Sequence, residues 1–349
     1  MMKGISIGKK IIGEQRPCFV IAEAGVNHNG EMALAKQLID AATKAGADAV
    51  KFQTFKTEGV VTKHVKIAAY AQKNLGKAVS QQEMVKKLEL SYDDFRALKK
   101  YCDSKRIIFL STPHSFDAID FLEPLVPAYK FGSGDLTNLP ALSYAAKKRK
   151  PMLLGTGMAT LAEVRTAVRT IRNAGNNKIV AMHCTTNYPC PVHEVNLNAM
   201  LTMRHSLNCL VGYSDHTLGI QVPVMAVTLG AVVIEKHFTM DTTLPGPDHK
   251  ASLEPEELTE MITAIRDVRT ILGSYEKKPT ASEKRIMGLV RKSIVANQDI
   301  KKGTILQEKM LIIKRPGTGL APEKLGSILG KRTKRSIKKD DVIALSMVE

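Results

Sequence analysis

One pattern repeats along the first 275 residues: a short β-branched run ends in polar residues, and a helical stretch follows. Strand and helix alternating over roughly 250 residues are typical of a closed (β/α)8 barrel, the TIM barrel. An open doubly wound sheet is the alternative, but no GxGxxG motif follows the first run. We therefore predict a barrel of the α/β class. The eight runs are Pro17–Gly25, Ala47–Phe55, Arg106–Pro113, Pro127–Asp135, Pro151–Met158, Lys178–Thr185, Cys209–His216 and Ala231–Phe238.

The C-terminal part has a different pattern. Residues 273–282 (GSYEKKPTAS) have the composition of a linker, and short strands with turns but no long amphipathic helix are expected beyond it. Asp299–Leu306 (DIKKGTIL) is nearly repeated at Ser336–Ile343 (SIKKDDVI), which suggests a pseudo-symmetric fold. We expect a barrel domain with an N-terminal extension over 1–272, a linker over 273–282 and a small β-rich domain over 283–349.

The net charge of +17 raises the question of nucleic-acid binding. From Ser282 onward there are 16 Lys and Arg against seven Asp and Glu, so much of the excess lies in the C-terminal part. Aromatic residues make up only 5% of the chain and no basic stretch is interleaved with them, so nucleic acid is not the expected partner. A small anionic substrate explains the sign of the charge equally well.

Targeting signals are not evident. No apolar run reaches the roughly 18 residues of a membrane-spanning helix, and Met1–Arg16 does not have the pattern of a signal peptide. The five cysteines have neither metal-type nor redox-type spacing. We expect a cytoplasmic protein that does not act on a membrane.

Almost every predicted strand ends in polar groups, where barrel enzymes carry their chemistry. Glu23 ends the first strand, and Lys51 and Gln53 share one face of the second. Any one such residue is most simply explained as part of a structural ion pair or as a helix cap. Polar residues at the ends of eight strands together indicate an active site. The long polar connection from Lys56 to Gln82 is a candidate lid. The other strand-end residues are Ser111, Thr112, Lys130, Ser133, Asp135, Thr156, His183, Cys184, Thr185, Ser214, Asp215, His216, Glu235 and His237.

Two kinds of ligand are indicated. Lys51 and Lys130, with nearby hydroxyls and two Gly-x-Gly segments, suit a phosphate and a carboxylate. His216 and His237 end adjacent strands and can approach one divalent ion, with Glu235, Asp215 or Glu23 nearby, where the ion would polarise a carbonyl. A hydrogen-bonded histidine pair without metal is the alternative. Structural zinc is disfavoured, because Cys184 is the only cysteine close by.

Nine motifs in order along the chain resemble those of the N-acetylneuraminate (sialic acid) synthases and their N,N'-diacetyllegionaminate synthase relatives. The last part of the chain resembles their antifreeze-like, or SAF, domain. The motifs are IAEAGVNHNG (21–30), VKFQTF (50–55), STP (111–113), YKFGSGD (129–135), HCTTNYP (183–189), GYSDHT (212–217), EKHF (235–238), GPDH (246–249) and KRPGTG (314–319).

The resemblance implies an enzyme, a transferase that condenses phosphoenolpyruvate with the open-chain aldehyde of an N-acyl amino sugar and releases phosphate. By this resemblance Glu23, Asp135, His216 and His237 are the catalytic residues. The two histidines would bind a divalent ion, Mn²⁺ first, with Mg²⁺ or Co²⁺ as alternatives. Phosphoenolpyruvate would be held by Lys51, Thr112, Lys130, Ser133 and Ser214, and Glu23, Gln53, Asp135, Tyr188 and Asp248 would contact the sugar or position water.

Arg315, in the KRPGTG motif, would reach the sugar from the partner subunit of a domain-swapped homodimer. The first expectation for the product is N-acetylneuraminate, from an acceptor of the N-acetylmannosamine type. The alternative is N,N'-diacetyllegionaminate, from a 2,4-diacetamido-trideoxyhexose. The GPDH motif argues against the pseudaminic acid branch. Gly155, Thr186 and Asp135 depart from residues found in some relatives, so the acceptor and its 6-phosphorylation stay open.

Two other functions are considered. A Schiff-base aldolase on the same fold would use Lys130 or Lys236 and would need a lysine with a lowered pKa. A non-catalytic role would make the basic C-terminal domain a binding module for nucleic acid or a surface.

Overall fold

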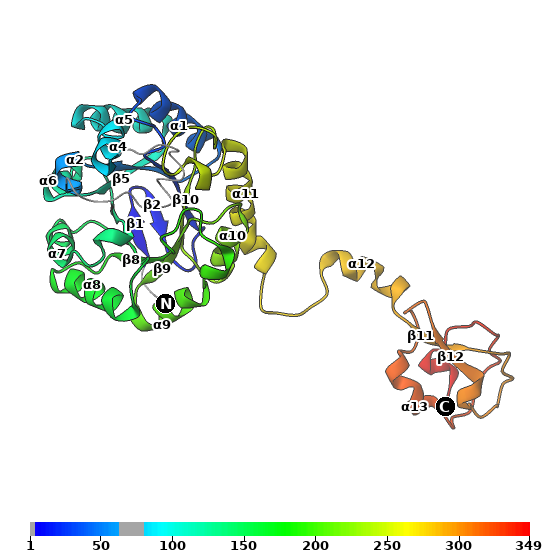
Figure 1. Ribbon diagram of the computed structural model, residues 1–349. Coiled ribbons are helices and arrows are strands. Elements are labelled where there is room, and N and C mark those ends of the chain that lie inside the picture. The colour runs from blue at the N-terminus through cyan, green and yellow to red at the C-terminus, as the bar shows by residue number, and fades with distance from the viewer. Residues whose placement is uncertain (1–3, 63–79) are drawn as a thin grey trace. The chain divides into compact units, whose positions relative to one another are not determined.

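The computed structural model describes residues 4–62 and 80–349. Within it the chain forms two compact units, Met1–Gly273 and Ser274–Glu349. The first unit contains the predicted eight parallel strands and their helices (Figure 1). The strands are β3 (Phe19–Gly25), β4 (Ala49–Thr54), β5 (Ile108–Pro113), β6 (Tyr129–Phe131), β7 (Met152–Gly155), β8 (Ile179–His183), β9 (Leu210–Asp215) and β10 (Val233–His237).

The ladder runs in the order β5-β4-β3-β10-β9-β8-β7-β6. β5 and β6, at its two ends, lie next to each other and bring the ring nearly to closure. Neighbouring strands pair in parallel, with Glu23 opposite Lys51 and His237 opposite Glu23. All C-terminal ends of the strands therefore meet at one mouth, as the sequence pattern predicts.

Helices surround the barrel, and the longer ones bury an apolar face against it. In α1 the buried positions include Leu38, Ile39 and Ala42, at the predicted spacing. Capping boxes at Ser91 and Thr160 fix the starts of α5 and α8. The helices are α1 (Met32–Lys44), α2 (Thr57–Val60), α4 (Gln81–Lys87), α5 (Tyr92–Lys105), α6 (Phe116–Leu122), α7 (Leu139–Lys147), α8 (Leu161–Asn173), α9 (Asn198–Leu207), α10 (Gln221–Thr228) and α11 (Pro255–Leu272), with short 3₁₀ turns η1 (Ser133–Asp135), η2 (Val192–Glu194) and η3 (His249–Ala251).

A hairpin that the sequence analysis did not identify precedes the barrel. It consists of β1 (Ile5–Ile7) and β2 (Lys10–Ile12), joined through Gly8 at a φ of 57°. Ile5, Ile7 and Ile12 are buried in one cluster with residues from nearly all the barrel strands, such as Phe19, Leu153 and Val233. The hairpin crosses the ring when the barrel is seen end-on (Figure 1), so it closes the end opposite the mouth.

Helix α12 (Ala281–Val290) differs from the expectation for the C-terminal part. It begins where the predicted linker ends and leaves Ile286 and Leu289 exposed. Thr280 caps it in a capping box with Glu283. That signature, a Thr followed three residues later by Glu, is legible in the sequence as a helix start.

The second unit also contains the antiparallel pair β11 (Ser293–Ala296) and β12 (Leu311–Lys314), with turns η4 (Glu308–Met310), η5 (Pro322–Lys324) and η6 (Leu345–Met347) and the helix α13 (Leu325–Ile328). The two repeated segments pair with each other through reciprocal 2.8 Å backbone hydrogen bonds between Ile300 and Ile337. Gly303 and Asp340 occupy equivalent repeat positions, and both have positive φ angles, 82° and 72°. The repeat is therefore structural.

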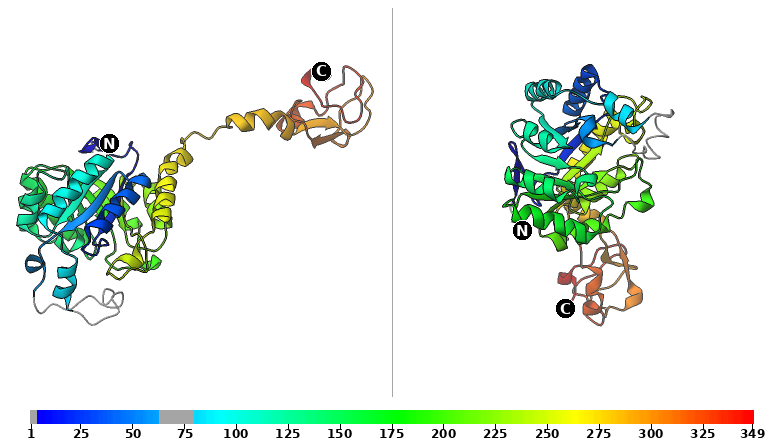
Figure 2. Two further views of the ribbon diagram at one scale, coloured as in Figure 1. Left: turned by 90° about the horizontal axis from the view of Figure 1, so that it is seen from above. Right: turned by 60° about the vertical axis from the view of Figure 1, so that its left-hand side comes forward.

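The candidate lid from Lys56 to Gln82 is described only at its two ends, by α2 and by the start of α4, because residues 63–79 lie outside the described residues. Among the residues that are described, no helix has the length and apolar character needed to cross a membrane. Figure 2 gives two further views of the barrel and its helices.

Candidate active site

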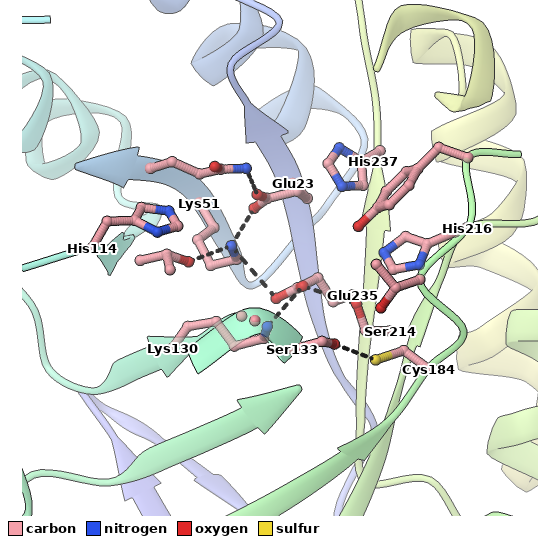
Figure 3. Close-up of a pocket in the computed structure, with 16 residues that line it drawn as sticks. Glu23, Lys51, His114, Lys130, Ser133, Cys184, Ser214, His216, Glu235 and His237 are labelled. Atoms are coloured by element: carbon pink, nitrogen blue, oxygen red, sulfur yellow. Dashed lines mark hydrogen bonds and ion pairs between the residues drawn. The ribbon is translucent and has the colours of Figure 1, made fainter. Parts of the chain in front are cut away.

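A cavity opens at the mouth of the barrel, and ten of the thirteen predicted site residues line it (Figure 3). These ten come from β3, β4, β5, β6, β9 and β10 and from the segments that follow β6, β8 and β9. They are Glu23, Lys51, Gln53, Thr112, Lys130, Ser133, Tyr188, Ser214, His216 and His237. The predicted convergence of strand-end residues is therefore observed.

The polar residues form two layers. Ser214 and Glu235 face each other across β9 and β10, and His216 and His237 follow two residues later on each chain segment. Because a strand rises about 3.3 Å per residue, the histidine layer lies roughly 6.6 Å nearer the mouth.

The deeper layer is a buried cluster of two lysines and two glutamates. The Lys51 ammonium lies 2.8 Å from Glu23 Oε2 and 3.9 Å from Glu235 Oε2, and it donates to Thr112 Oγ1 at 2.9 Å. The Lys130 ammonium lies 3.2 Å from Glu235 Oε1, which also accepts a 3.0 Å hydrogen bond from Ser214. Both lysines are only 3% exposed, so their charges act in a poorly screened space.

The pKa values of the two glutamates are shifted in opposite directions. Burial raises the pKa of Glu23 to about 7, because desolvation outweighs the opposing attraction of Lys51. Burial alone would also raise the pKa of Glu235, but Lys130 and then Lys51 outweigh it and hold the pKa at about 2. Glu235 is therefore a permanent anion that orients both lysines, and Glu23 can take up or release a proton near neutral pH.

The outer layer brings three aromatic rings together. The ring centroids of His216 and His237 lie 5.7 Å apart, and the Tyr188 ring lies 4.1 Å from His216 and 5.6 Å from His237. Burial lowers the pKa of both histidines, that of His237 well below its usual range. Both imidazoles are therefore neutral at pH 7 and have lone pairs to offer.

These histidines fit a divalent ion with few protein ligands. His216 Nδ1 donates to the Thr185 carbonyl at 2.6 Å, which leaves its Nε2 free to bind an ion. His237 Nδ1 is buried without a hydrogen-bond partner in the described part of the chain. No group of three or more His, Cys, Asp or Glu among the described residues is placed to hold a metal, so water or substrate would complete the coordination.

The carboxylates considered as additional metal ligands are engaged elsewhere. Asp215 lies 2.5 Å from the Lys236 ammonium and also accepts hydrogen bonds from the Thr217 hydroxyl. Glu23 and Glu235 are ion-paired with the cavity lysines. Lys236 points out of the cavity, is fully buried and also donates to the Thr217 carbonyl.

Loops from β6, β7 and β8 meet around Ser133. Ser133 Oγ lies 3.1 Å from Cys184 Sγ and accepts a 3.0 Å hydrogen bond from the Gly157 amide. A Cβ added at Gly157 would lie 2.2 Å from Thr186 Oγ1, and one at Gly155 would lie 3.0 Å from the Ser133 amide nitrogen. Because Gly155 has no side chain, Ser133 can occupy the space that a Cβ at position 155 would need.

Three predicted site residues lie outside this lining. Asp135, half-buried in η1, has its Oδ2 3.8 Å from Nδ1 of His114, which does line the cavity. Asp248 lines a second, adjoining hollow. Arg315 belongs to the other compact unit, where it precedes a cis peptide bond to Pro316.

His114 was not among the predicted site residues, Glu235 was considered only as a carboxylate near the metal, and Cys184 only as a disfavoured zinc ligand. His114 directly follows the STP motif, so its position after a strand end was the available signal. Burial, followed by the charges of Lys51 and Lys130, lowers the pKa of His114 to about 4. Its neutral ring makes an edge contact with Phe55, and its Nε2 is buried without a hydrogen-bond partner among the described residues.

Comparison with protein families decides the relationship. Residues 38–277 match the NeuB family, and residues 291–349 match the SAF domain. The chain belongs to the NeuB family. Its architecture, an eight-stranded barrel followed by a SAF domain, is thereby confirmed.

Relatives of this NeuB-family chain include nonulosonic acid synthases. It is 49% identical to the N,N'-diacetyllegionaminic acid synthase of Legionella pneumophila, with 93% of each chain covered. It is 45% identical to the synthase of the same name from Campylobacter jejuni, over 93% of this chain and 98% of that one. The structure of an N-acetylneuraminic acid synthetase from Leptospira borgpetersenii has a TM-score of 0.72 and 34% identity, covering 82% of this chain and 95% of the other.

Proposed function

We propose that this protein condenses phosphoenolpyruvate with the open-chain aldehyde of an N-acyl amino sugar, giving a nonulosonic acid and phosphate. The observation that carries the proposal is the one cavity that two buried lysines and two neutral histidines line together. The deeper layer suits an anionic donor, and the outer layer suits the carbonyl that the donor attacks.

The donor would bind at the deeper layer. Lys51 and Lys130 supply two positive charges, and Thr112, Ser133 and Ser214 supply hydroxyls around them. Charge-assisted hydrogen bonds from such groups are the usual means of holding phosphate and carboxylate oxygens. Glu235 would keep both ammonium groups aimed into the cavity through its own contacts with them.

The reaction requires proton transfer at two points. C3 of the enol forms a bond to the aldehyde carbon, whose oxygen takes a proton and becomes a hydroxyl. Water then adds to the cationic C2 and loses a proton, and the C2–oxygen bond to phosphate breaks to leave the keto acid. Glu23, with a pKa near 7, is the residue best suited to exchange these protons, and Gln53 Nε2 lies 3.5 Å from its Oε1.

His216 and His237 would hold a divalent ion, with Mn²⁺ as the first choice. When bound, the ion would polarise the acceptor carbonyl as a Lewis acid. Tyr188, packed against both rings, would keep their orientation.

The lysine environment disfavours a Schiff-base aldolase. Burial alone would lower the pKa of Lys130, but Glu235 outweighs it and raises the pKa, which keeps the amine protonated. Lys236 is paired with Asp215 outside the cavity. Neither lysine offers the neutral nucleophilic amine that a Schiff base requires.

The acceptor is proposed from the relatives. N-acetylmannosamine was the first expectation, but two relatives at 49% and 45% identity are named N,N'-diacetyllegionaminic acid synthases. They favour a 2,4-diacetamido-trideoxyhexose as the acceptor and N,N'-diacetyllegionaminate as the product. We further propose that the protein is cytoplasmic and acts as a domain-swapped homodimer in which Arg315 reaches the partner's site.

The test is phosphate release from phosphoenolpyruvate by the purified full chain, with each of the two sugars. We expect release only with sugar present, loss of release in a chelator and recovery on adding Mn²⁺. Lys130→Met should abolish release, whereas Lys147→Met, at an exposed lysine, should not. Release without a sugar, or borohydride trapping of a pyruvate adduct, would contradict the proposal.

A further inference from the structure

His114 lies where two hollows meet. It follows β5 directly, and it lines both the catalytic cavity and the adjoining hollow that Asp248 lines. In the strand ladder β5 is four places from β9, which ends just before His216, so His114 and His216 belong to opposite walls of the mouth. Figure 3 shows His114 beside Lys51 and away from His216. A ligand that binds at His216 and extends into the adjoining hollow therefore passes His114.

The ring of His114 is held by three contacts. Its backbone amide donates to the Thr54 carbonyl at 3.1 Å, which ties the start of this loop to β4. Its ring meets Phe55 edge-on, with the centroids 6.1 Å apart and the planes at 75°. Its Nδ1 lies 3.8 Å from Oδ2 of Asp135 in η1. The orientation of the ring is therefore set by the barrel mouth itself.

These surroundings make the other ring nitrogen of His114 a hydrogen-bond acceptor. Burial, followed by the charges of Lys51 and Lys130, lowers the pKa of His114 to about 4, so the ring is neutral at pH 7 and has one N–H. The Asp135 carboxylate favours the tautomer that has this proton on Nδ1. Nε2 then has a lone pair, and it is buried without a hydrogen-bond partner in the part of the chain that the structure describes.

The adjoining hollow contains a second acceptor of this kind. Gln81, at the start of α4, lines it, and Oε1 of Gln81 is likewise buried with no partner among the described residues. Asp248 adds a carboxylate to the same lining. No Lys or Arg among the residues that the structure describes lines this hollow. Because buried polar groups in proteins are normally hydrogen-bonded, these acceptors indicate a ligand that brings donors.

Of the two proposed substrates, only the sugar brings such donors. Fully ionised phosphoenolpyruvate has carboxylate and phosphate oxygens but neither N–H nor O–H groups, so it offers nothing to the lone pair of His114. An open-chain N-acyl amino sugar has several hydroxyls and an amide N–H. A buried acceptor without a donor is costly, and a ligand that donates to it removes that cost.

We propose that Nε2 of His114 accepts a hydrogen bond from one hydroxyl or amide N–H of the sugar acceptor, and that His114 is thereby a specificity-determining residue. This inference rests on the proposed function and adds a sugar contact to those expected from the sequence. A site built to form such a hydrogen bond discriminates strongly against an analogue that lacks the donor.

The test is a cycle between the side chain at position 114 and the groups of the sugar. The full chain with Mn²⁺ and saturating phosphoenolpyruvate would be assayed with the parent sugar and with analogues that each lack one hydroxyl or replace the amide N–H by an ester oxygen. For one analogue, the wild type should lose roughly tenfold in kcat/KM, as expected for one neutral hydrogen bond. That loss should disappear in His114→Phe, and the other analogues should keep their wild-type ratios to the parent sugar.

His114→Phe keeps an aromatic ring against Phe55 and removes both nitrogens. It should raise the KM for the parent sugar roughly tenfold and leave the KM for phosphoenolpyruvate unchanged. His114→Gln keeps an acceptor that can replace Nε2, so it should recover most of the lost kcat/KM. His193→Phe, at an exposed histidine outside the cavity lining, should behave as the wild type.

His114→Asn separates the hydrogen bond from the structural contacts of the ring. Its side-chain amide can still donate to Asp135 but does not reach the position of Nε2. The cycle should therefore give the same result with His114→Asn as with His114→Phe, including the case in which the phenylalanine variant does not fold. Far-ultraviolet circular dichroism would establish that each assayed variant is folded.

The outcomes separate two failures. If the wild type releases no phosphate with any sugar, the proposed function and this inference fall together. If it does, but every analogue has the same ratio to the parent sugar in the wild type and in the folded His114 variants, the function stands and the role of His114 is wrong. An equal rise in the KM for both substrates, or equal losses in His114→Gln and His114→Asn, would also overturn it.

Discussion

Asp248 is a carboxylate in an unfavourable place, and replacing it should stabilise the protein. It is 8% exposed, and no hydrogen bond or ion pair to its carboxylate occurs within the described residues. Burial raises its pKa to about 6. Because the native pKa lies above the usual value of about 3.9, the native state binds more protons between these values, and stability falls as the pH rises through that window.

The magnitude follows from the shift. About two pKa units correspond to a cost of about 3 kcal/mol once the pH exceeds 6. An asparagine side chain has nearly the same shape and no charge, so Asp248→Asn should raise the free energy of unfolding by up to about 3 kcal/mol at pH 7.5 and by about 1.5 kcal/mol at pH 5. The gain should therefore shrink on acidification.

The assay is urea unfolding of both proteins at pH 5 and pH 7.5. Asp241→Asn is the matched control in the same loop, because hydrogen bonds from Thr243 lower the pKa of Asp241 and favour its charged form. That control should give no gain at pH 7.5. Equal stability of wild type and Asp248→Asn at pH 7.5, or a gain that does not change with pH, would refute the reasoning.

Three further predictions concern the site and its frame. His237→Ala should keep the far-ultraviolet circular dichroism spectrum of a folded protein but lose more than about 99% of turnover. Calorimetry should show that it no longer binds Mn²⁺. Wild-type affinity for Mn²⁺ in this variant would rule out the metal role of His237. Arg315→Ala should raise the KM for the sugar roughly tenfold or more with little change for phosphoenolpyruvate, as loss of about 1.4 kcal/mol of binding implies, and equal changes would contradict its assignment. Gly30→Ala should lower the free energy of unfolding by about 2 kcal/mol or more, and Gly175→Ala by roughly 1 kcal/mol. Both glycines have positive φ angles, but only at Gly30 would the added Cβ clash with a carbonyl oxygen, that of Lys87. Equal costs would show that this contact relaxes freely.

The barrel was predictable because the periods of two residues in a strand and of 3.6 residues in a helix are both visible within short stretches of the sequence. Each predicted strand contains the observed one, and parity alone places Lys51 and Gln53 on the cavity side of β4. The same rule separates Glu235 and His237 from Lys236 on β10, so the convergence of lysines and histidines follows once eight strands close into a ring.

What the sequence did not reveal depends on three-dimensional partners. The β1–β2 hairpin is too short for a period to emerge, and its burial comes from barrel residues far along the chain. The role of Glu235 depends on its lying between Lys51 and Lys130, from β4 and β6, which no spacing in the chain records. The hollow beside the cavity likewise assembles from segments after β3, β4 and β10 together with α4.

The hairpin at the base of the barrel has a kinetic consequence. Since Ile5, Ile7 and Ile12 seal that end, the described residues leave the mouth as the opening through which both ligands enter and leave. The molecule seated on the lysines has to arrive before the one seated beside the histidines, and it is blocked from leaving while the second is present. Steady-state kinetics should therefore be sequential and ordered, with the anionic donor first on and the sugar second.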